Sequence, residues 1–357
     1  MSAPTWPALL NRLVAGENLT AADTAWAMHQ VMDDDVEPAV LAGFLVALRV
    51  KGETAQEMTG LIEAVLSAAA PLPINGDAVD VVGTGGDGAH TVNISTMAAV
   101  VVAAAGIPVV KHGGRSSSSA CGSADVLEAL GVSLALSPAA AARCLAEAGI
   151  CYLFAPNVHA GLRHASPVRR ALGVPTAINY IAPLVNPARP RAACVGCSNA
   201  DVAPVLAQVL ADRGCSALVV RGHDGLDEIS TAAPTHVWVV TGNTVTPTTI
   251  DAAEFGLPRS APGDLRGGDA PHNAAVARRI IEGDTGPVRD AVLINAAAAI
   301  AAYRGLDGDV RARMTAGLSE AAAAIDSGAA KKTLDRWAQA AAQQNGFPSQ
   351  SVDRALP

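Results

Sequence analysis

Apolar residues recur at helical spacing through the first 70 residues of the chain, and no segment there alternates between apolar and polar positions. Thr54 opens the sequence Thr-Ala-Gln-Glu, a capping box that marks the start of an amphipathic helix. Earlier helix starts are indicated at Thr20 and after Pro38. These patterns predict three or four short helices, followed by a Pro- and Gly-punctuated linker at residues 71–76.

Beyond the linker, short apolar strands alternate with helices, a pattern typical of a mostly parallel sheet covered by helices. The first apolar segments of this part are residues 78–82, 94–105, 107–111 and 124–130. Later strands are expected at residues 152–154, 191–195, 216–220 and 236–240, and helical spacing returns from residue 273 to 342. We predict an α/β fold: a small N-terminal helical domain (residues 1–72) and a large α/β domain (residues 73–357) with a mostly parallel central sheet and flanking helices.

The composition describes a compact protein with an acidic charge balance. Half of the 357 residues are hydrophobic and 16% are charged, which excludes a chain that stays unfolded for lack of apolar surface. A net charge of −8 offers no general attraction to nucleic acid or to an anionic membrane, so any anion must be bound by a local site. The longest apolar run, residues 97–110, is too short to span a membrane, and no secretory signal opens the chain. We expect a cytoplasmic protein whose six cysteines form no disulfide framework.

A glycine-rich turn after the first predicted strand is the first segment with candidate chemistry. It runs Gly83-Thr84-Gly85-Gly86-Asp87, and Thr91, Asn93, Ser95 and Thr96 lead into an apolar helix. Glycines let backbone N–H groups close on an anion, and the helix N-terminus adds its dipole, so phosphate is the natural ligand. An ordinary tight turn explains the glycines as well. Asp87 favours the binding site, because a carboxylate there can hold a sugar hydroxyl or a metal.

The second such segment, residues 110–119, follows another predicted strand. It supplies Lys111, His112, Arg115 and a run of serine hydroxyls, which together could grip a pyrophosphate group. In doubly wound sheets ligands gather at the carboxyl ends of the strands, so both loops can face one site. A solvated serine-rich loop is the alternative explanation.

The third segment, residues 222–230, contains the adjacent carboxylates Asp227 and Glu228 directly after an apolar strand. Magnesium takes few protein carboxylates and completes its shell with water and substrate phosphate, which matches this sparse supply. Acidic residues at the start of a helix are the alternative. Beside two candidate phosphate loops, the metal site is favoured.

Two other features favour a structural interpretation or a lining role. Cys194 and Cys197 have the spacing of a metal-binding pair, but no second pair completes a site, and residues three apart on a strand point to opposite faces. His159 and His164 flank Arg163 in a predicted loop without acidic companions, so the wall of a substrate pocket is the better functional interpretation.

Taken together, these motifs resemble the anthranilate phosphoribosyltransferases, a family with the nucleoside phosphorylase/phosphoribosyltransferase-like fold. The resemblance covers most of the chain and is carried by residues 49–54, 83–87, 93–96, 111–113, 122–125, 154–156, 168–170 and 225–228. It implies transfer of the phosphoribosyl group from phosphoribosyl pyrophosphate (PRPP) to the amine of anthranilate, with release of pyrophosphate, in tryptophan biosynthesis. It also implies a homodimer joined through helical domains, each completed by a segment near residues 167–187, with the active site between the domains.

The same resemblance implies a role for each matching residue. The Gly83–Asp87 loop, Thr91, Asn93, Ser95 and Thr96 are expected to bind PRPP, with Lys111 and Ser123 near its phosphates. Asp227, Glu228 and the Ser95 hydroxyl are expected to bind Mg²⁺. His112, Gly114, His159 and Arg169 are expected to line the acceptor site, with Arg169 facing the anthranilate carboxylate. No catalytic acid or base is expected, because an aromatic amine is already neutral near neutral pH and positioning and charge stabilisation suffice.

Two departures from the family pattern lie on the acceptor side. Gly114 stands where the family has Asn in Lys-His-Gly-Asn-Arg, and residues 178–184 replace Phe-Asn-Leu-Leu-Gly-Pro-Leu. A paralogous phosphoribosyltransferase with another aromatic or heteroaromatic acceptor therefore stays open as an alternative. Pyrimidine nucleoside phosphorylase is disfavoured by the acidic pair. A non-catalytic nucleic-acid-binding protein on the same fold is disfavoured by the negative charge and the 3% aromatic content.

Overall fold

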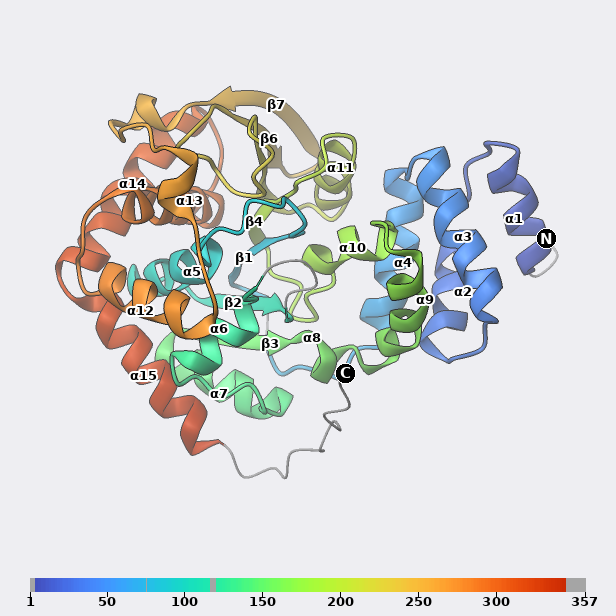
Figure 1. The fold of residues 1–357 in the computed structure, drawn as a ribbon, viewed down its shortest axis with the longest axis horizontal. Helices are drawn as coiled ribbons and strands as arrows, with labels where there is room; N and C mark the ends of the chain where they lie inside the picture. The colour runs from blue at the N-terminus through green and yellow to red at the C-terminus, as the bar shows by residue number, and fades with distance from the viewer. Residues whose placement is uncertain (1–3, 75, 116–119, 345–357) are drawn as a thin grey trace.

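The computed structural model describes residues 4–74, 76–115 and 120–344, and within them one seven-stranded sheet forms the centre of the molecule (Figure 1). Its order is β3-β2-β1-β4-β5-β6-β7. The strands are β1 (Val79–Gly83), β2 (Val109–Gly113), β3 (Ile150–Phe154), β4 (Ala192–Gly196), β5 (Ser216–Gly222), β6 (Thr235–Thr241) and β7 (Thr244–Ile250). The first five are parallel, whereas β6 and β7 pair antiparallel.

The sheet grows from β1 to β3 on one side and continues with β4 on the other side of β1. The strand order therefore reverses between β1 and β4, and open α/β sheets bind ligands at the carboxyl ends of the strands at such a point. Both strands end at a glycine there, Gly83 opposite Gly196 in the register.

The predicted α/β fold with a mostly parallel sheet is confirmed, with two differences. The strand expected at residues 107–111 lies two residues later, as β2. The hydrophobic pattern does not predict β7, because its threonines and Pro247 lack an apolar face and most of its residues are exposed. Pro247 is tolerated because β7 is an edge strand, where one side of the backbone needs no partner.

Four helices precede the sheet: α1 (Trp6–Val14), α2 (Ala21–Met32), α3 (Pro38–Lys51) and α4 (Ala55–Ser67). The predicted starts at Thr20 and Thr54 are both N-caps, and each forms a complete capping box. The later α-helices are α5 (Ile94–Ala104), α6 (Ser123–Ala129), α7 (Pro138–Ala148), α8 (Ala155–Val158), α9 (Ser166–Leu172), α10 (Ala177–Ile181), α11 (Ala203–Asp212), α12 (Ala270–Ile281), α13 (Pro287–Arg304), α14 (Val310–Asp326) and α15 (Ala329–Gln343). Short 3-10 helices are η1 (Ala160–Ala165), η2 (Ala182–Leu184), η3 (Ala252–Phe255) and η4 (Pro262–Leu265).

Alternating strand residues divide the hydrophobic core between the two faces of the sheet. Val81 packs into a core with α5 and α13, whereas Val82 packs into a core with α4 and α11. The second core also takes in α1 to α3, α9 and α10, so the chain returns to the N-terminal helices between β3 and β4 (Figure 1). None of the helices in the described part of the chain is long and apolar enough to cross a membrane.

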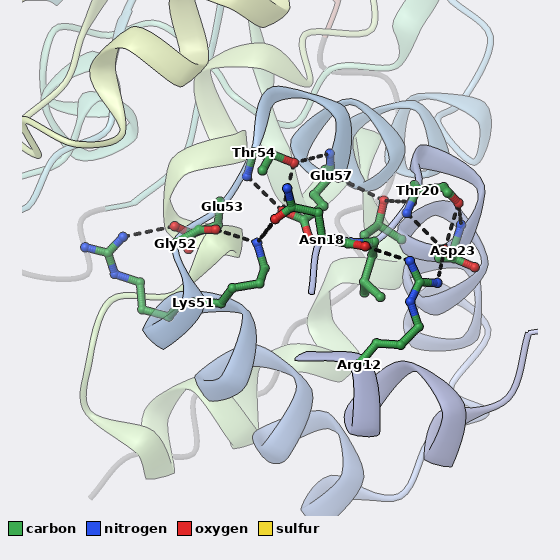
Figure 2. Close-up of polar contacts among 12 residues, drawn as sticks. Arg12, Asn18, Thr20, Asp23, Lys51, Gly52, Glu53, Thr54 and Glu57 are labelled. Carbon is green, nitrogen blue, oxygen red and sulfur yellow. Dashed lines mark hydrogen bonds and ion pairs between the residues drawn. The ribbon is translucent and has the colours of Figure 1, made fainter. Parts of the chain in front are cut away.

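Glu57 fixes the turn between α3 and α4 (Figure 2). Its fully buried carboxylate accepts hydrogen bonds from the Leu19 N–H at 2.9 Å, from Lys51 Nζ at 2.9 Å and from the Thr54 N–H at 2.8 Å. A buried charge is stable only when it is paired and fully hydrogen-bonded, and Glu57 meets this condition with donors from three segments. The ends of α2, α3 and α4 are thereby tied into one unit.

Candidate active site

The glycine-rich turn and the acidic pair meet at the carboxyl edge of the sheet. The Gly85 N–H donates to Asp227 Oδ2 at 2.7 Å, and the Ser198 hydroxyl, from the loop after β4, donates to the Gly85 carbonyl at 2.8 Å. Gly83 and Gly196 end the two strands beneath this contact. A Cβ on either would overlap Asp227, so both positions require glycine. The loops after β1, β4 and β5 therefore form one structure.

The acidic pair carries raised pKa values. Burial raises the pKa of Asp227 to about 7, the nearby charge of Asp87 acts in the same direction, and the Gly85 N–H opposes both. Burial also raises the pKa of Glu228 well above its ordinary value, reinforced by repulsion from Asp227 and opposed by Lys111. The site thus holds more carboxylate than its own cations can neutralise. Neither residue starts a helix, since both lie in the loop between β5 and β6.

This donor set fits a magnesium ion. A divalent cation supplies the positive charge that crowded carboxylates lack. In the described ranges, no group of three or more His, Cys, Asp or Glu is arranged to hold a metal ion, so the protein offers few ligands. Mg²⁺ is suited to such a site, because it keeps several waters and binds through one or two carboxylates together with substrate phosphates.

Lys111 lies beneath the acidic pair, within the sheet. It is 2% exposed, and its Nζ donates to the Val81 carbonyl and, at 3.3 Å, to the Ser95 hydroxyl at the start of α5. Burial lowers the pKa of Lys111, while the charges of Asp80, Glu228 and Asp227 raise it. Lys111 and Ser95 are therefore brought together with the predicted metal ligands.

The start of α5 contains the other predicted donor-binding residues. Asn93 is its N-cap residue, and the Asn93 side chain is engaged by the Cys121 carbonyl and by Asn273. Thr91, two residues earlier, forms an antiparallel bridge with Arg266. Thr96 is 1% exposed, and its hydroxyl has no hydrogen-bond partner within the described structure.

The loop after β2 differs in one respect from the sequence-based expectation. Arg115, expected to grip pyrophosphate, instead pairs with the carboxylates of Asp125 and Glu128 on α6. Two carboxylates of a neighbouring helix neutralise the guanidinium, a contact that the local sequence does not reveal, and a role of Arg115 toward pyrophosphate stays a prediction. The Ser123 hydroxyl lies 3.3 Å from the Gly114 carbonyl. The serines at positions 116–119 lie outside the described residues.

Two buried histidines lie next to each other on the predicted acceptor side. The rings of His112 and His159 pack edge to face with centroids 5.2 Å apart. His112 Nδ1 lies 3.1 Å from the Ala182 carbonyl, and His159 Nε2 lies 2.7 Å from the Val185 carbonyl. A carbonyl only accepts hydrogen bonds, so each of these ring nitrogens carries the proton. The other nitrogen of each ring is buried without a partner in the described residues.

Desolvation keeps both histidines neutral. Burial lowers the pKa of His112 to about 3, and the neighbouring His159 adds to this effect. The pKa of His159 is also lowered by burial. Neutral rings with one protonated nitrogen leave hydrogen-bond acceptors, not charges, on this side of the site.

Arg169 and Gly114 complete the predicted acceptor set. Arg169 lies on α9, and burial lowers its pKa. No carboxylate pairs with it among the described residues, and its Nε is buried without a hydrogen bond. Gly114 has open space around it, since the nearest atom to an added Cβ would be the Ala155 Cβ at 4.0 Å.

The structure also places the cysteine pair and His164, the other residues singled out from the sequence. Cys194 packs into the core on one face of the sheet and Cys197 into the core on the other, as their spacing on a strand predicts. Burial raises the pKa of both thiols. His164 has an acidic neighbour after all, because its Nδ1 lies 3.0 Å from Asp34, at the C-terminal end of α2.

Sequence reasoning missed three side chains that organise the site: Ser198, Tyr152 and Asn273. Ser198 lies two residues after the end of β4, so its position near a carboxyl end was an available signal. Tyr152 supports Ser123 through a 2.8 Å hydroxyl contact, and Asn273 supports Asn93 at 2.9 Å. No local pattern marks these two, because their partners are distant in sequence.

Comparison with known proteins identifies the family. Residues 75–331 match the a/b domain of the glycosyl transferase family, and residues 7–69 match its helical bundle domain. The chain is 57% identical over 345 residues to an anthranilate phosphoribosyltransferase from Salinispora arenicola, covering 96% of this chain and 98% of the relative.

Two solved structures share the fold over nearly their whole length. The crystal structure of anthranilate phosphoribosyltransferase from Thermus thermophilus superimposes with a TM-score of 0.87 at 36% identity, covering 94% of this chain and 99% of the other. The enzyme from Saccharomyces cerevisiae, in complex with PRPP and Mg, superimposes with a TM-score of 0.84 at 26% identity, covering 95% and 98%.

Proposed function

Because the chain belongs to the anthranilate phosphoribosyltransferases of the glycosyl transferase family, we propose that the loops at the carboxyl edge of its sheet bind PRPP with magnesium and that the neighbouring histidine pair and Arg169 bind anthranilate. The protein is a pentosyltransferase. It transfers the phosphoribosyl group of PRPP to the amine of anthranilate and releases pyrophosphate.

The contact between Gly85 and Asp227 carries the assignment of the donor site. It joins an anion-binding type of loop to a carboxylate pair with raised pKa values, at the point where the strand order reverses. A ligand that binds both the loop and the carboxylate pair needs phosphate groups together with a divalent cation. The complex of the yeast enzyme with PRPP and Mg supports this choice.

Each donor-side residue has a role in this proposal. The Gly83–Asp87 loop and the start of α5, with Thr91, Asn93, Ser95 and Thr96, bind the phosphoribosyl group. Lys111 and Ser123 lie toward the phosphates, and Asp227, Glu228 and the Ser95 hydroxyl hold the ion. When bound, Mg²⁺ neutralises the charge that develops on the departing pyrophosphate.

The acceptor-side residues position the amine without acid–base chemistry. Arg169 is a cation without a carboxylate partner in the described part of the chain, which suits the anthranilate carboxylate. His112 and His159 present unprotonated nitrogens that can accept a hydrogen bond from an N–H. The reaction passes through a transition state with oxocarbenium character, so positioning and electrostatic stabilisation supply the rate.

We also propose the limits of the two domains and a homodimeric assembly. We take residues 1–72, completed by residues 167–187, as the helical domain and residues 73–357 as the α/β domain. The large apolar side chains that the described structure exposes are Val14, Val46, Val50 and Val174, all in this helical domain. Exposed apolar side chains of this kind support a homodimer formed through the helical domains. The six cysteines, all reduced in the described part of the chain, support a cytoplasmic location.

A pyrophosphate-release assay tests the function. The purified protein is incubated with PRPP, Mg²⁺ and a panel of aromatic amines and acids. Efficient release with anthranilate, and much slower release with the other acceptors, is expected. Rapid release with another acceptor and none with anthranilate would instead establish the paralogous transferase. Light scattering of the wild type and of Val50→Lys tests the dimer, since a charge in an apolar interface should yield monomers.

A further inference from the structure

The residues that lead from the glycine-rich loop into α5 are paired with a segment from the last third of the chain. Thr91 forms an antiparallel bridge with Arg266. The Val92 N–H donates to the Leu265 carbonyl at 2.9 Å, and the Gly267 N–H donates to the His90 carbonyl at 2.8 Å. A Cβ at position 267 would lie 2.8 Å from the Thr91 carbonyl oxygen, so this close approach requires glycine.

Asn273, in the first turn of α12, ties this paired segment to Asn93. Asn273 is 2% exposed. Its Oδ1 accepts from the Gly268 N–H at 2.8 Å, and its Nδ2 donates to Asn93 Oδ1 at 2.9 Å. Both halves of a buried amide are thus used, which is the condition under which burying it is not costly.

The orientation of Asn93 is determined by its partners. Its Nδ2 donates at 3.1 Å to the carbonyl of Cys121, which can only accept. Its Oδ1 must therefore face a donor, and Asn273 supplies one. Since Asn93 is the N-cap residue of α5 and Cys121 directly precedes the N-cap Gly122 of α6, one amide fixes the starts of both helices relative to each other.

Those two helix starts carry Ser95 and Ser123, to which the proposed function assigns contacts with the magnesium ion and with the donor phosphates, respectively. We propose that Asn273 is a positioning residue for the donor: through Asn93 it holds the starts of α5 and α6 at the separation that PRPP requires. The inference rests on the proposed function for the identity of the donor. It assigns a role in donor binding to a helix that contributes no direct ligand.

A double-mutant cycle on donor affinity tests the proposal. Asn273→Ala, Asn93→Ala and the double variant are titrated calorimetrically with PRPP and Mg²⁺ in the absence of anthranilate. Each single variant should bind PRPP about tenfold more weakly, as expected for the loss of one net hydrogen bond. Because Asn273 acts through Asn93, the double variant should be within about twofold of the weaker single variant. The KM for anthranilate should not change.

Arg278→Ala is the matched control on the same helix. Arg278 anchors α12 through a 3.1 Å hydrogen bond to the carbonyl of Leu130, the C-cap residue of α6, at the opposite end of that helix from Ser123. The Arg278→Ala substitution should lower the melting temperature and leave the affinity for PRPP unchanged. Should Asn273→Ala fail to fold, Asn273→Ser, with a smaller polar side chain, replaces it in the cycle.

Three results would overturn the proposal: unchanged PRPP affinity in the Asn273 variant, additive losses in the double variant, or an equal loss in Arg278→Ala. A failure of the proposed function is separable. A wild-type protein that binds PRPP in the titration but does not modify anthranilate contradicts the acceptor assignment, and the cycle still tests Asn273. A wild-type protein that does not bind PRPP overturns both.

Discussion

The backbone N–H of Gly85 lies 2.7 Å from Oδ2 of Asp227, although 142 residues separate them in the sequence. The contact joins the loop after β1 to the loop after β5 across β4, where Ser198 also holds Gly85. The glycine-rich loop and the acidic pair are therefore physically joined, and if they bind PRPP and magnesium as proposed, substitutions in either one should weaken PRPP binding.

Replacing Asp227 by Asn and Glu228 by Gln should abolish magnesium-dependent turnover without unfolding the protein. The isosteric amides replace two buried carboxyl groups whose pKa values are raised by burial, which disfavours their charged forms in the absence of a cation. We expect a loss in kcat of about 100-fold or more, and an unchanged or higher melting temperature. The control is Glu282→Gln with Asp284→Asn, which makes the same charge change in surface ion pairs. Wild-type magnesium dependence in the first double variant would refute the metal site.

Gly85→Val should weaken PRPP binding more than it weakens the fold. Gly85 has φ of 67°, and an added Cβ would meet no protein atom within 4 Å, so the side chain would enter the space assigned to the donor. Gly106→Val is the matched control. Gly106 also has positive φ and open surroundings, but it follows the C-terminal end of α5, whereas the proposed donor site lies at the N-terminal end of that helix. Both variants should lose about 1–3 kcal/mol of stability from backbone strain. Only Gly85→Val should lose PRPP affinity in calorimetry; equal affinities would place the phosphate site elsewhere.

Arg169→Gln should lower kcat/KM for anthranilate, with little effect on stability or on the KM for PRPP. No ion pair of Arg169 is lost within the described structure, so stability should barely change. A hydrogen bond to a charged group is worth roughly 1.5–3 kcal/mol, which predicts a fall in kcat/KM for anthranilate of about tenfold to 100-fold, with the KM for PRPP unchanged. Arg170→Gln, at the exposed neighbouring position, is the control. If both variants behave alike in steady-state kinetics, Arg169 does not bind the carboxylate.

Gly114→Asn distinguishes anthranilate from a bulkier acceptor. Gly114 is not at positive φ and has open space at its Cβ position, so Asn should be accommodated without strain. If anthranilate is the acceptor, the added amide should leave kcat/KM similar or raise it by up to about tenfold, the value of one net hydrogen bond. A marked loss of activity with anthranilate in the variant, measured by steady-state kinetics, would favour an acceptor that uses the extra space.

The neutral state of His112 should make stability fall at mildly acidic pH. Its folded pKa of about 3 lies below its ordinary value of 6.5, so the unfolded state binds a proton first as the pH falls. The stabilisation is complete above pH 6.5 and is lost progressively toward pH 3, at about 1.4 kcal/mol per pH unit. Urea unfolding at about pH 7.5 and about pH 5.5 should show wild type losing roughly 1.4 kcal/mol more than His112→Gln. Equal losses would mean that His112 is protonated in the folded protein.

Local sequence chemistry was sufficient for the four N-terminal helices and for most of the strands, and it singled out most of the candidate residues. The capping box at Thr54, the glycine turn from Gly83 to Asp87 and the carboxylates Asp227 and Glu228 are each readable within a few residues, because caps, turns and strand ends depend on neighbours in the chain. The resemblance of these motifs to one family then supplied the reaction. The limits of the domains and the role of each site residue stay predictions.

Only the tertiary structure decided which of these residues are available for a ligand. It paired Arg115 with Asp125 and Glu128, and it placed Asn273 behind Asn93, from a helix about 180 residues away. It also showed why Gly196 must be glycine, since the carbonyl of Asp227 occupies the space of its Cβ. Such contacts depend on strand order and on how helices pack on the sheet. Composition and periodicity indicate on which face of a helix or strand a residue lies, but not which group, distant in sequence, contacts it on that face.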